Sequence, residues 1–351
     1  MDKITLYLET QVSHANQIIT GFLLLKKQGW EVELVDRRDS GSIYCGMPMV
    51  RAEYRGQRLV YDMGDGYNVP EDMETALKEC DVYFKRSFSE EKNHRLLPDY
   101  ADKMHPLGLY YRVTCRENPL NEPMWKQLLK PLTGRAPQRY FTPEVFEGKP
   151  DRCDGKPVKI LFLTQLWNDH EPDFSEADNA ERTYINETRI AIIRKLQERY
   201  GDAFLGGLND NALSRAWAPE LILPKRYTER KRYLKLVHES DICIGTMGLF
   251  ESIGGKTAEY VAAARGIVNE RLHYSVSGDF EEGKNYLAFE TVQQCLDAVD
   301  RLVKDPEMLY TMKQANAEYY RNYMKPEVLV GNSLKQVDEI LEKQREFAKS
   351  P

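Results

Sequence analysis

The fold is decided by residues 241–268, which read DICIGTMGLFESIGGKTAEYVAAARGIV. The apolar run Ile242–Ile244 predicts a buried strand, and Lys256–Arg265 predicts a helix rich in small residues. A second apolar strand is predicted at Ile267–Val268. A strand, a helix and a strand in this order form the crossover unit of a parallel sheet, so this stretch predicts an α/β protein.

The beginning of the chain shows the same alternation. Ile4–Leu8 and Trp30–Val35 have the apolar pattern of strands, and Asn16–Gln28 between them carries apolar residues at helical spacing. Farther along, residues 55–57 separate two alternating stretches and predict a β-hairpin. The first half is therefore expected to form a sheet of its own.

A second series of strands and helices follows the segment Glu147–Pro157, which is rich in glycine, proline and charge and which we interpret as a linker. After it, Lys159–Leu163 and Glu220–Leu223 are predicted strands, and Glu187–Tyr200 is a predicted helix. A length of 351 residues also suits two domains. Open sheets of this kind bind ligands at the carboxyl ends of their parallel strands.

Composition excludes several classes of protein. The charges sum to −6 and 42% of residues are hydrophobic, which is too apolar for a disordered chain and too acidic for a dedicated nucleic-acid binder. No stretch reaches the roughly 18 apolar residues of a membrane span, and we expect no secretion signal at the N-terminus. The six cysteines lie singly, as expected of reduced thiols in a cytoplasmic protein.

The loop and helix start within residues 241–268 have the chemistry to hold a nucleoside diphosphate. Gly254 and Gly255 let the backbone approach a phosphate closely, and a helix N-terminus supplies amide N–H groups. Lys256 adds a positive charge, and Glu259 one turn later has a carboxylate that accepts two hydrogen bonds from a ribose diol. The alternative is that Glu259 only stabilises the helix as an N-terminal acid and that the glycines only form a turn.

A P-loop is disfavoured although Gly255-Lys256-Thr257 resembles the end of one. That motif needs a glycine at position 250, and this chain has Phe250 there. The P-loop also normally follows an early strand of its domain, whereas this stretch lies late. We therefore do not expect an ATPase or a kinase.

The spacing of two glutamates resembles a known family motif. Glu251 and Glu259 stand in a Glu-x7-Glu pattern, followed by a small-residue helix, Gly266 and an apolar strand. This is similar to the motif of GT-B-fold retaining glycosyltransferases of the group 1 family. The resemblance covers roughly Lys156–Pro326 and departs from the family at Ile267, where the usual residue is proline.

The resemblance implies a GT-B-like fold with two Rossmann-like, doubly wound domains facing a central cleft. Residues 1–150 would bind the acceptor, with a closing helix at about 325–351 packed back on them, and residues 156–324 would bind the nucleotide sugar. The family assigns the ribose to the position of Glu259 and the donor sugar to that of Glu251. The implied activity is transfer from a UDP or GDP sugar to a glycan, lipid-linked or small-molecule acceptor, as in polysaccharide biosynthesis.

Most further candidates follow predicted strands, where side chains reach the expected site, whereas His105 begins a strand-like stretch after a charged loop. The catalytic candidates are Glu251, His14 and His105. The donor-binding candidates are Glu259, Gly254, Gly255, Lys256, Thr257, Thr164, Gln165, Lys225, Arg226 and Tyr227. The alternatives for the first half are that Ser13 or Asn16 only caps the following helix, and that His105 is packed or exposed.

No metal site is expected. Asp62–Asp65 is not the Asp-x-Asp of metal-dependent glycosyltransferases, and no set of His and Cys residues has metal-ligand spacing. We therefore expect an enzyme that needs no cofactor besides its nucleotide-sugar co-substrate.

One segment suggests peripheral contact with a membrane on the cytoplasmic side. Trp125–Arg135 mixes an aromatic residue, leucines and cations, which suits an anionic surface that carries a lipid-linked acceptor. The alternative, which we favour, is an amphipathic helix packed within the protein.

Two other functions remain open. The first is a sugar-nucleotide epimerase of the same architecture, which would need clustered acid and base side chains that the sequence does not pair. The second is a non-catalytic protein that binds nucleotide sugars. Donor, acceptor, linkage, catalytic base and oligomeric state are not indicated by the residues.

Overall fold

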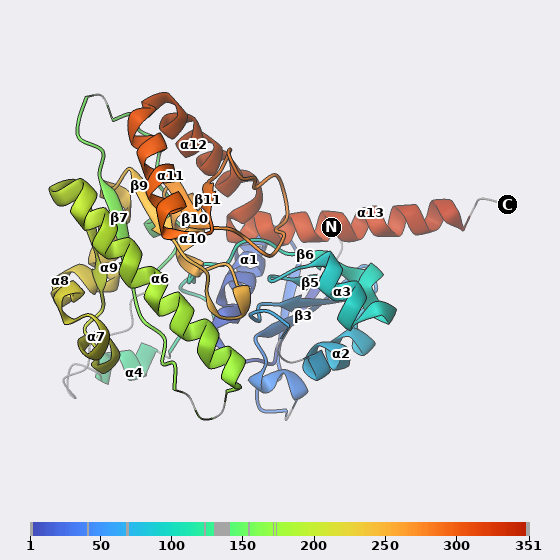
Figure 1. Ribbon diagram of the computed structural model, residues 1–351. Coiled ribbons are helices and arrows are strands. Elements are labelled where there is room, and N and C mark those ends of the chain that lie inside the picture. The colour runs from blue at the N-terminus through green and yellow to red at the C-terminus, as the bar shows by residue number, and fades with distance from the viewer. Residues whose placement is uncertain are drawn as a thin grey trace. The chain divides into compact units, whose positions relative to one another are not determined.

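The structure is a computed structural model in which the chain forms two compact units (Figure 1). The first comprises Met1–Val145, Ser275–Ser277 and Arg321–Pro351, and the second comprises Phe146–Tyr274 and Gly278–Tyr320. The structure describes residues 3–348 except 41, 68–69, 123, 130–140, 154, 171 and 173.

The first unit contains a six-stranded sheet in the order β2-β1-β3-β4-β5-β6. Its strands are β1 (Ile4–Leu8), β2 (Val32–Asp36), β3 (Met49–Tyr54), β4 (Gln57–Asp62), β5 (Val82–Lys85) and β6 (Met104–Pro106). The predicted hairpin is confirmed: Arg55 and Gly56 both have positive φ, which suits a two-residue turn between twisted strands. Because this hairpin enters the middle of the sheet, β3 is antiparallel to both β1 and β4, whereas the other pairings are parallel.

Both faces of this sheet carry buried apolar side chains, and helices of the first unit pack on them. The predicted first helix is confirmed as α1 (Asn16–Lys27), and it packs against α13 (Pro326–Phe347) (Figure 1). At Gly21 the two helices are so close that a Cβ would lie 2.3 Å from the carbonyl oxygen of Pro326. The remaining helices of this half are α2 (Pro70–Glu79), α3 (Glu90–Leu96), α4 (Met124–Leu129) and α5 (Pro143–Phe146).

The second unit contains a five-stranded sheet in the order β11-β10-β9-β7-β8, with parallel pairings between its strands. The strands are β7 (Ile160–Thr164), β8 (Phe204–Leu208), β9 (Ile242–Gly245), β10 (Gly266–Glu270) and β11 (Leu287–Phe289). The predicted α/β class is therefore confirmed. The predicted strand at Glu220–Leu223 is wrong: Pro219–Leu221 forms a 3-10 turn, and Ile222 makes a single bridge to Leu208.

Two helices of this unit differ from their predicted bounds. The helices are α6 (Glu176–Tyr200), α7 (Ala212–Trp217), α8 (Lys225–Thr228), α9 (Arg230–Glu239), α10 (Gly255–Ala262), α11 (Val292–Lys304) and α12 (Pro306–Tyr319). Helix α6 starts well before the predicted Glu187 because Ser175 and Asp178 form a capping box at its N-terminus. Helix α10 ends before the predicted Arg265, and Ala264 has a φ of 55°.

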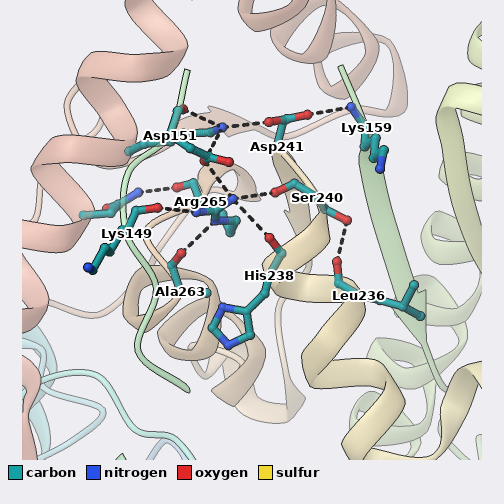
Figure 2. A network of polar contacts seen from close by, with 11 residues as sticks. Lys149, Asp151, Lys159, Leu236, His238, Ser240, Asp241, Ala263 and Arg265 are labelled. Atoms are coloured by element: carbon teal, nitrogen blue, oxygen red, sulfur yellow. Dashed lines mark hydrogen bonds and ion pairs between the residues drawn. The ribbon is translucent and has the colours of Figure 1, made fainter. Parts of the chain in front are cut away.

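The segment interpreted as a linker is bonded into the second unit (Figure 2). The amide of Gly148 donates to the carbonyl oxygen of Ala262 at 2.9 Å. Buried Arg265 pairs with Asp151 at 3.0 Å. Its guanidinium also donates to the carbonyl oxygens of Lys149 (2.6 Å), Ala263 (2.7 Å), Ser240 (3.0 Å) and His238 (3.4 Å).

A second buried cation completes this network. The ammonium of Lys313, on α12, contacts Oδ1 of Asp151 at 3.0 Å and Oδ1 of Asp241 at 2.7 Å. Asp241 immediately precedes β9, and its Oδ2 accepts a hydrogen bond from the amide of Lys159, just before β7. The network therefore joins the segment to the amino edge of the sheet, which leaves the carboxyl edge for other groups.

Candidate functional site

Buried Arg189 of α6 ties together the carboxyl ends of two neighbouring strands in the second unit. Its guanidinium donates to the carbonyl oxygen of Gln165 at 2.7 Å, after β7, and to the hydroxyl of Thr246 at 2.9 Å, after β9. It also donates to the carbonyl oxygen of Met247 at 2.9 Å. The Met247 amide in turn donates to the carboxylate of Glu270, at the end of β10, at 2.9 Å. Burial lowers the pKa of Arg189 to about 10, so the group remains a cation at neutral pH.

The loop from Met247 to Gly254 has an unusual backbone. Phe250 and Glu251 have φ values of 57° and 58°, in the left-handed region that side chains other than glycine rarely adopt. Both amides donate to the carboxylate of Glu181 on α6, each at 3.1 Å. The hydroxyl of Tyr274 donates to the Phe250 carbonyl oxygen at 2.9 Å. The loop is thus held in this conformation by groups far away in the sequence.

The loop leads into α10, which begins with two glycines. Gly254 is the N-cap and Gly255 is the first residue of the helix. Lys256 comes next; its ammonium donates to the carbonyl oxygen of Leu163 and lies 5.3 Å from the ring centroid of Tyr233. Burial and two nearby guanidinium groups lower the pKa of Lys256 to about 8. The helix start therefore combines amide donors with a poorly solvated cation. A bound anion would offset the cost of keeping that charge away from water.

Glu259 lies one turn farther along α10 and is almost completely buried. Its carboxylate is held by Arg230, which donates from Nη1 to Oε2 at 3.0 Å and from Nη2 to Oε1 at 2.5 Å. The Arg230 guanidinium also lies over the rings of Phe146 and Tyr233, 5.4 and 5.5 Å from their centroids. A ribose at Glu259 would share the carboxylate with Arg230, since carboxylate oxygens accept several hydrogen bonds each.

The other donor-binding candidates differ in exposure. Thr257 is buried, and its hydroxyl donates to the Asn269 side chain at 2.8 Å, so it contributes to the packing of α10 on β10. Thr164 is buried at the end of β7, whereas Gln165 is exposed directly after it. Three candidates lie on the short α8: Lys225, Arg226 and Tyr227. The Arg226 and Lys225 side chains are exposed on this helix.

The two candidate histidines belong to the first unit. His14 lies in a 3-10 turn before α1, with its ring centroid 5.3 Å from that of Tyr110. Burial and the Arg86 charge lower the pKa of His14. His105 lies on β6, 5.9 Å from the Phe84 ring, and burial lowers its pKa too. The lowered pKa favours the neutral form of both imidazoles, and a catalytic role for them stays a prediction.

Glu251, the third catalytic candidate, lies in the second unit. Its side chain is 42% exposed, and Oε1 is 3.9 Å from Nδ1 of His273. The alternative given for the first half, a side-chain cap on α1, is not seen: the N-cap of α1 is Ala15, without a side-chain hydrogen bond.

Four charged residues of this site were not predicted: Glu181, Arg189, Arg230 and Glu270. Glu270 ends β10 as Thr164 ends β7, so the rule that carboxyl ends carry site residues, applied to β10, would have found it. The other three lie on helices, and their partners are 70, 57 and 29 residues away. No local pattern distinguishes them from ordinary charged positions of a helix.

The predicted absence of a metal site and the predicted contact with a membrane both stay predictions. Among the described residues, no three His, Cys, Asp or Glu side chains gather as a metal site. In the same part of the chain, no helix combines the length and the apolar character that crossing a membrane requires. Of the segment Trp125–Arg135, residues 130–135 lie outside the described residues.

Comparisons with known proteins find similarity in structure only. No family model and no curated protein matches the chain. A glycosyltransferase from Rickettsia africae is 14% identical, with 94% of this chain and 81% of that one covered and a TM-score of 0.45. HepE from Anabaena, solved with UDP and glucose, is 11% identical, with 98% and 100% covered and a TM-score of 0.44. The C-terminal domain of a group 1 glycosyl transferase from Francisella tularensis is 11% identical, with 52% and 97% covered and a TM-score of 0.36.

Proposed function

We propose that this protein is a glycosyltransferase that binds a nucleotide-sugar donor at the carboxyl edge of the second unit's sheet. One observation carries the proposal: the first five residues of α10 present a glycine start, a half-buried cation of lowered pKa at Lys256 and a buried carboxylate at Glu259. These are the groups that a diphosphate and a ribose require, in that order along the helix. The Glu-x7-Glu resemblance, which includes Glu251, supports the same assignment.

In this proposal each group has a separate task. The amides at Gly254 and Gly255 and the ammonium of Lys256 bind the diphosphate and stabilise the charge that develops on it as the bond to the sugar breaks. Glu259, shared with Arg230, binds the ribose. The acceptor oxygen forms the new bond to the sugar carbon as the bond from that carbon to the diphosphate breaks, and its proton passes to the leaving diphosphate. Retention of configuration, independence of metal ions and acceptor binding by the first unit are further parts of the proposal, supported by the resemblance.

A panel of nucleotide sugars tests the proposal. Thermal unfolding is measured with each compound, because a ligand at about 100 times its Kd stabilises the folded state by about 2.7 kcal/mol. We expect one nucleotide sugar to raise Tm, and its nucleoside diphosphate to be released slowly without acceptor, in the presence or absence of EDTA. Binding without release would indicate a non-catalytic protein, and a lack of binding by every compound would refute the proposal.

A substitution at Glu259 tests the ribose assignment. The wild-type protein is expected to bind the ribonucleoside diphosphate about tenfold more tightly than its 2′-deoxy analogue, because a hydrogen bond to a charged group is lost in the analogue. Glu259→Gln keeps the shape of the side chain and removes its charge, so this preference should largely disappear. The two dissociation constants are measured by calorimetry for both proteins.

The control for this experiment is Glu318→Gln, an exposed position on α12. This variant should keep the preference for ribose. If Glu259→Gln also keeps it in full, the ribose is bound elsewhere.

A further inference from the structure

Two successive amides in the loop that carries Glu251 are held by a single distant carboxylate. Glu181 lies on α6, 70 residues before Glu251 in the sequence. Its Oε2 accepts a hydrogen bond from the Phe250 amide and its Oε1 accepts one from the Glu251 amide, each at 3.1 Å. Both oxygens of one side chain are thus used to hold two successive amides.

This arrangement explains why the loop keeps its strained backbone. Phe250 and Glu251 have φ values of 57° and 58°, and such residues persist only where the surroundings determine them. Adjacent amides that converge in a turn form a concave site for an anion. Here the anion is the Glu181 carboxylate, and hydrogen bonds to a charged acceptor are stronger than neutral ones.

The rest of the loop is held independently of Glu181. The hydroxyl of Tyr274 donates to the Phe250 carbonyl oxygen at 2.9 Å, and the Gly248 amide donates to the Ser252 carbonyl oxygen at 2.8 Å. These contacts close the loop but leave the amides of Phe250 and Glu251 to the carboxylate. Loss of Glu181 should therefore release these two amides and not the whole loop.

We propose that Glu181 is a positioning residue: it holds the backbone of Glu251 so that the Glu251 side chain contacts the donor sugar. The proposal rests on the proposed function. Glu181 itself touches neither the donor nor the acceptor; it acts only through the two amides. Its removal should therefore affect transfer through Glu251, while the nucleotide, bound at α10, keeps its affinity.

Amide hydrogen exchange tests whether Glu181 holds the loop, without any ligand. In Glu181→Ala, exchange at the amides of Phe250 and Glu251 should become about tenfold faster or more, with exchange in β9 unchanged. Glu181→Gln retains one acceptor oxygen and should show an intermediate effect. Glu187→Ala, an exposed position on the same helix, is the matched control and should leave the loop unchanged. Unchanged exchange in both Glu181 variants would overturn the proposal.

Steady-state kinetics test whether the held loop serves transfer. Glu181→Ala should lower kcat about tenfold and leave the Kd for the nucleoside diphosphate unchanged. In a Glu251→Ala background the same change should cause no further loss, because the side chain that it positions is already absent. An equal loss in both backgrounds would show that Glu181 is merely structural.

The outcome for Glu181 is separable from the outcome for the proposed function. If the wild-type protein binds no nucleotide sugar and releases no nucleoside diphosphate, the proposed function fails, and the role of Glu181 in transfer fails with it. The exchange experiment then still decides whether Glu181 holds the loop. If the wild-type protein transfers sugar and the kcat of Glu181→Ala is unchanged, only the positioning role is refuted.

Discussion

Replacing Lys313 by methionine is expected to lower the free energy of unfolding by about 3–5 kcal/mol. The Lys313 side chain is completely buried, and its ammonium contacts Asp241 at 2.7 Å and Asp151 at 3.0 Å. The Asp241 side chain is only 15% exposed. Methionine has a similar length but no charge, so the variant would leave the Asp241 carboxylate buried without its cation, and an uncompensated buried charge is costly.

Urea unfolding at neutral pH measures this effect. The matched control is Lys304→Met on α11, whose side chain is 77% exposed and pairs with Asp300 at 3.5 Å. An exposed pair of this kind contributes less than about 1 kcal/mol. If both variants lose the same free energy of unfolding, the buried ion pairs of the network in Figure 2 do not stabilise the fold more than an exposed pair does.

The pH dependence provides a second check on Lys313. Burial by itself raises the pKa of Asp241, but hydrogen bonds from Lys313 and from the Lys159 amide outweigh burial, and the net pKa is lowered. Its stabilising contribution is therefore present above the unfolded pKa of about 4 and is lost as pH falls through the folded pKa. In Lys313→Met the hydrogen bond from the ammonium is absent, so the burial of Asp241 is no longer offset and the pKa of Asp241 rises. As pH falls, protonation of Asp241 should then reduce the difference in free energy of unfolding between the wild type and the variant.

Nucleotide affinity is expected to decrease as pH rises through about 8 in the wild-type protein. The pKa of Lys256 is lowered to about 8, first by burial and then by neighbouring cations. A bound diphosphate favours the charged form and raises this pKa, so binding takes up protons near pH 8 to 9. Lys256→Met should bind roughly ten- to a hundredfold more weakly at pH 7, because a hydrogen bond between charged groups is lost, and its affinity should no longer vary in this pH range.

Calorimetry in two buffers of different ionisation enthalpy measures this proton uptake directly. Lys256→Arg remains charged throughout, so its affinity should be independent of pH between 7 and 9. The control Lys195→Met changes an exposed lysine on α6 and should bind as the wild-type protein does. If Lys256→Met retains the pH dependence of the wild type, another group titrates and Lys256 does not bind the diphosphate.

Local sequence patterns were enough to predict most elements of the fold. The apolar runs at β1, β7 and β9 and the helical spacing of α1 indicated these elements near their observed bounds. Residues 55–57 indicated the hairpin, because a glycine between two alternating stretches is a local turn signal, and the structure gives Arg55 and Gly56 the positive φ that such a turn requires. The strand prediction at Glu220–Leu223 was wrong because it also relied on a local pattern alone. A run of four mostly apolar residues suits a strand and a turn equally well, and only pairing with a neighbouring strand decides between them.

The candidate site could be predicted only where it is continuous in the sequence. Gly254, Gly255, Lys256 and Glu259 are neighbours on one loop and helix, so their order alone indicated a phosphate and ribose site. The partner of Glu259 and the anchor of Glu251 are on other helices, where a charged residue looks like any solvated position. The sequence also predicted too late a start for α6, so the helical turn that carries Glu181 was not predicted.

By itself, the sequence determined the α/β class, the position of the hairpin and the helix start that carries the Glu-x7-Glu motif, because each depends on residues close together in the chain. Only the tertiary structure decided which charges are paired: Arg230 with Glu259, Lys313 with Asp241, and Glu181 with the amides of the loop. The physical reason is that the energy of a charge depends on its burial and on partners brought close by folding, and neither is recorded in the local order of residues.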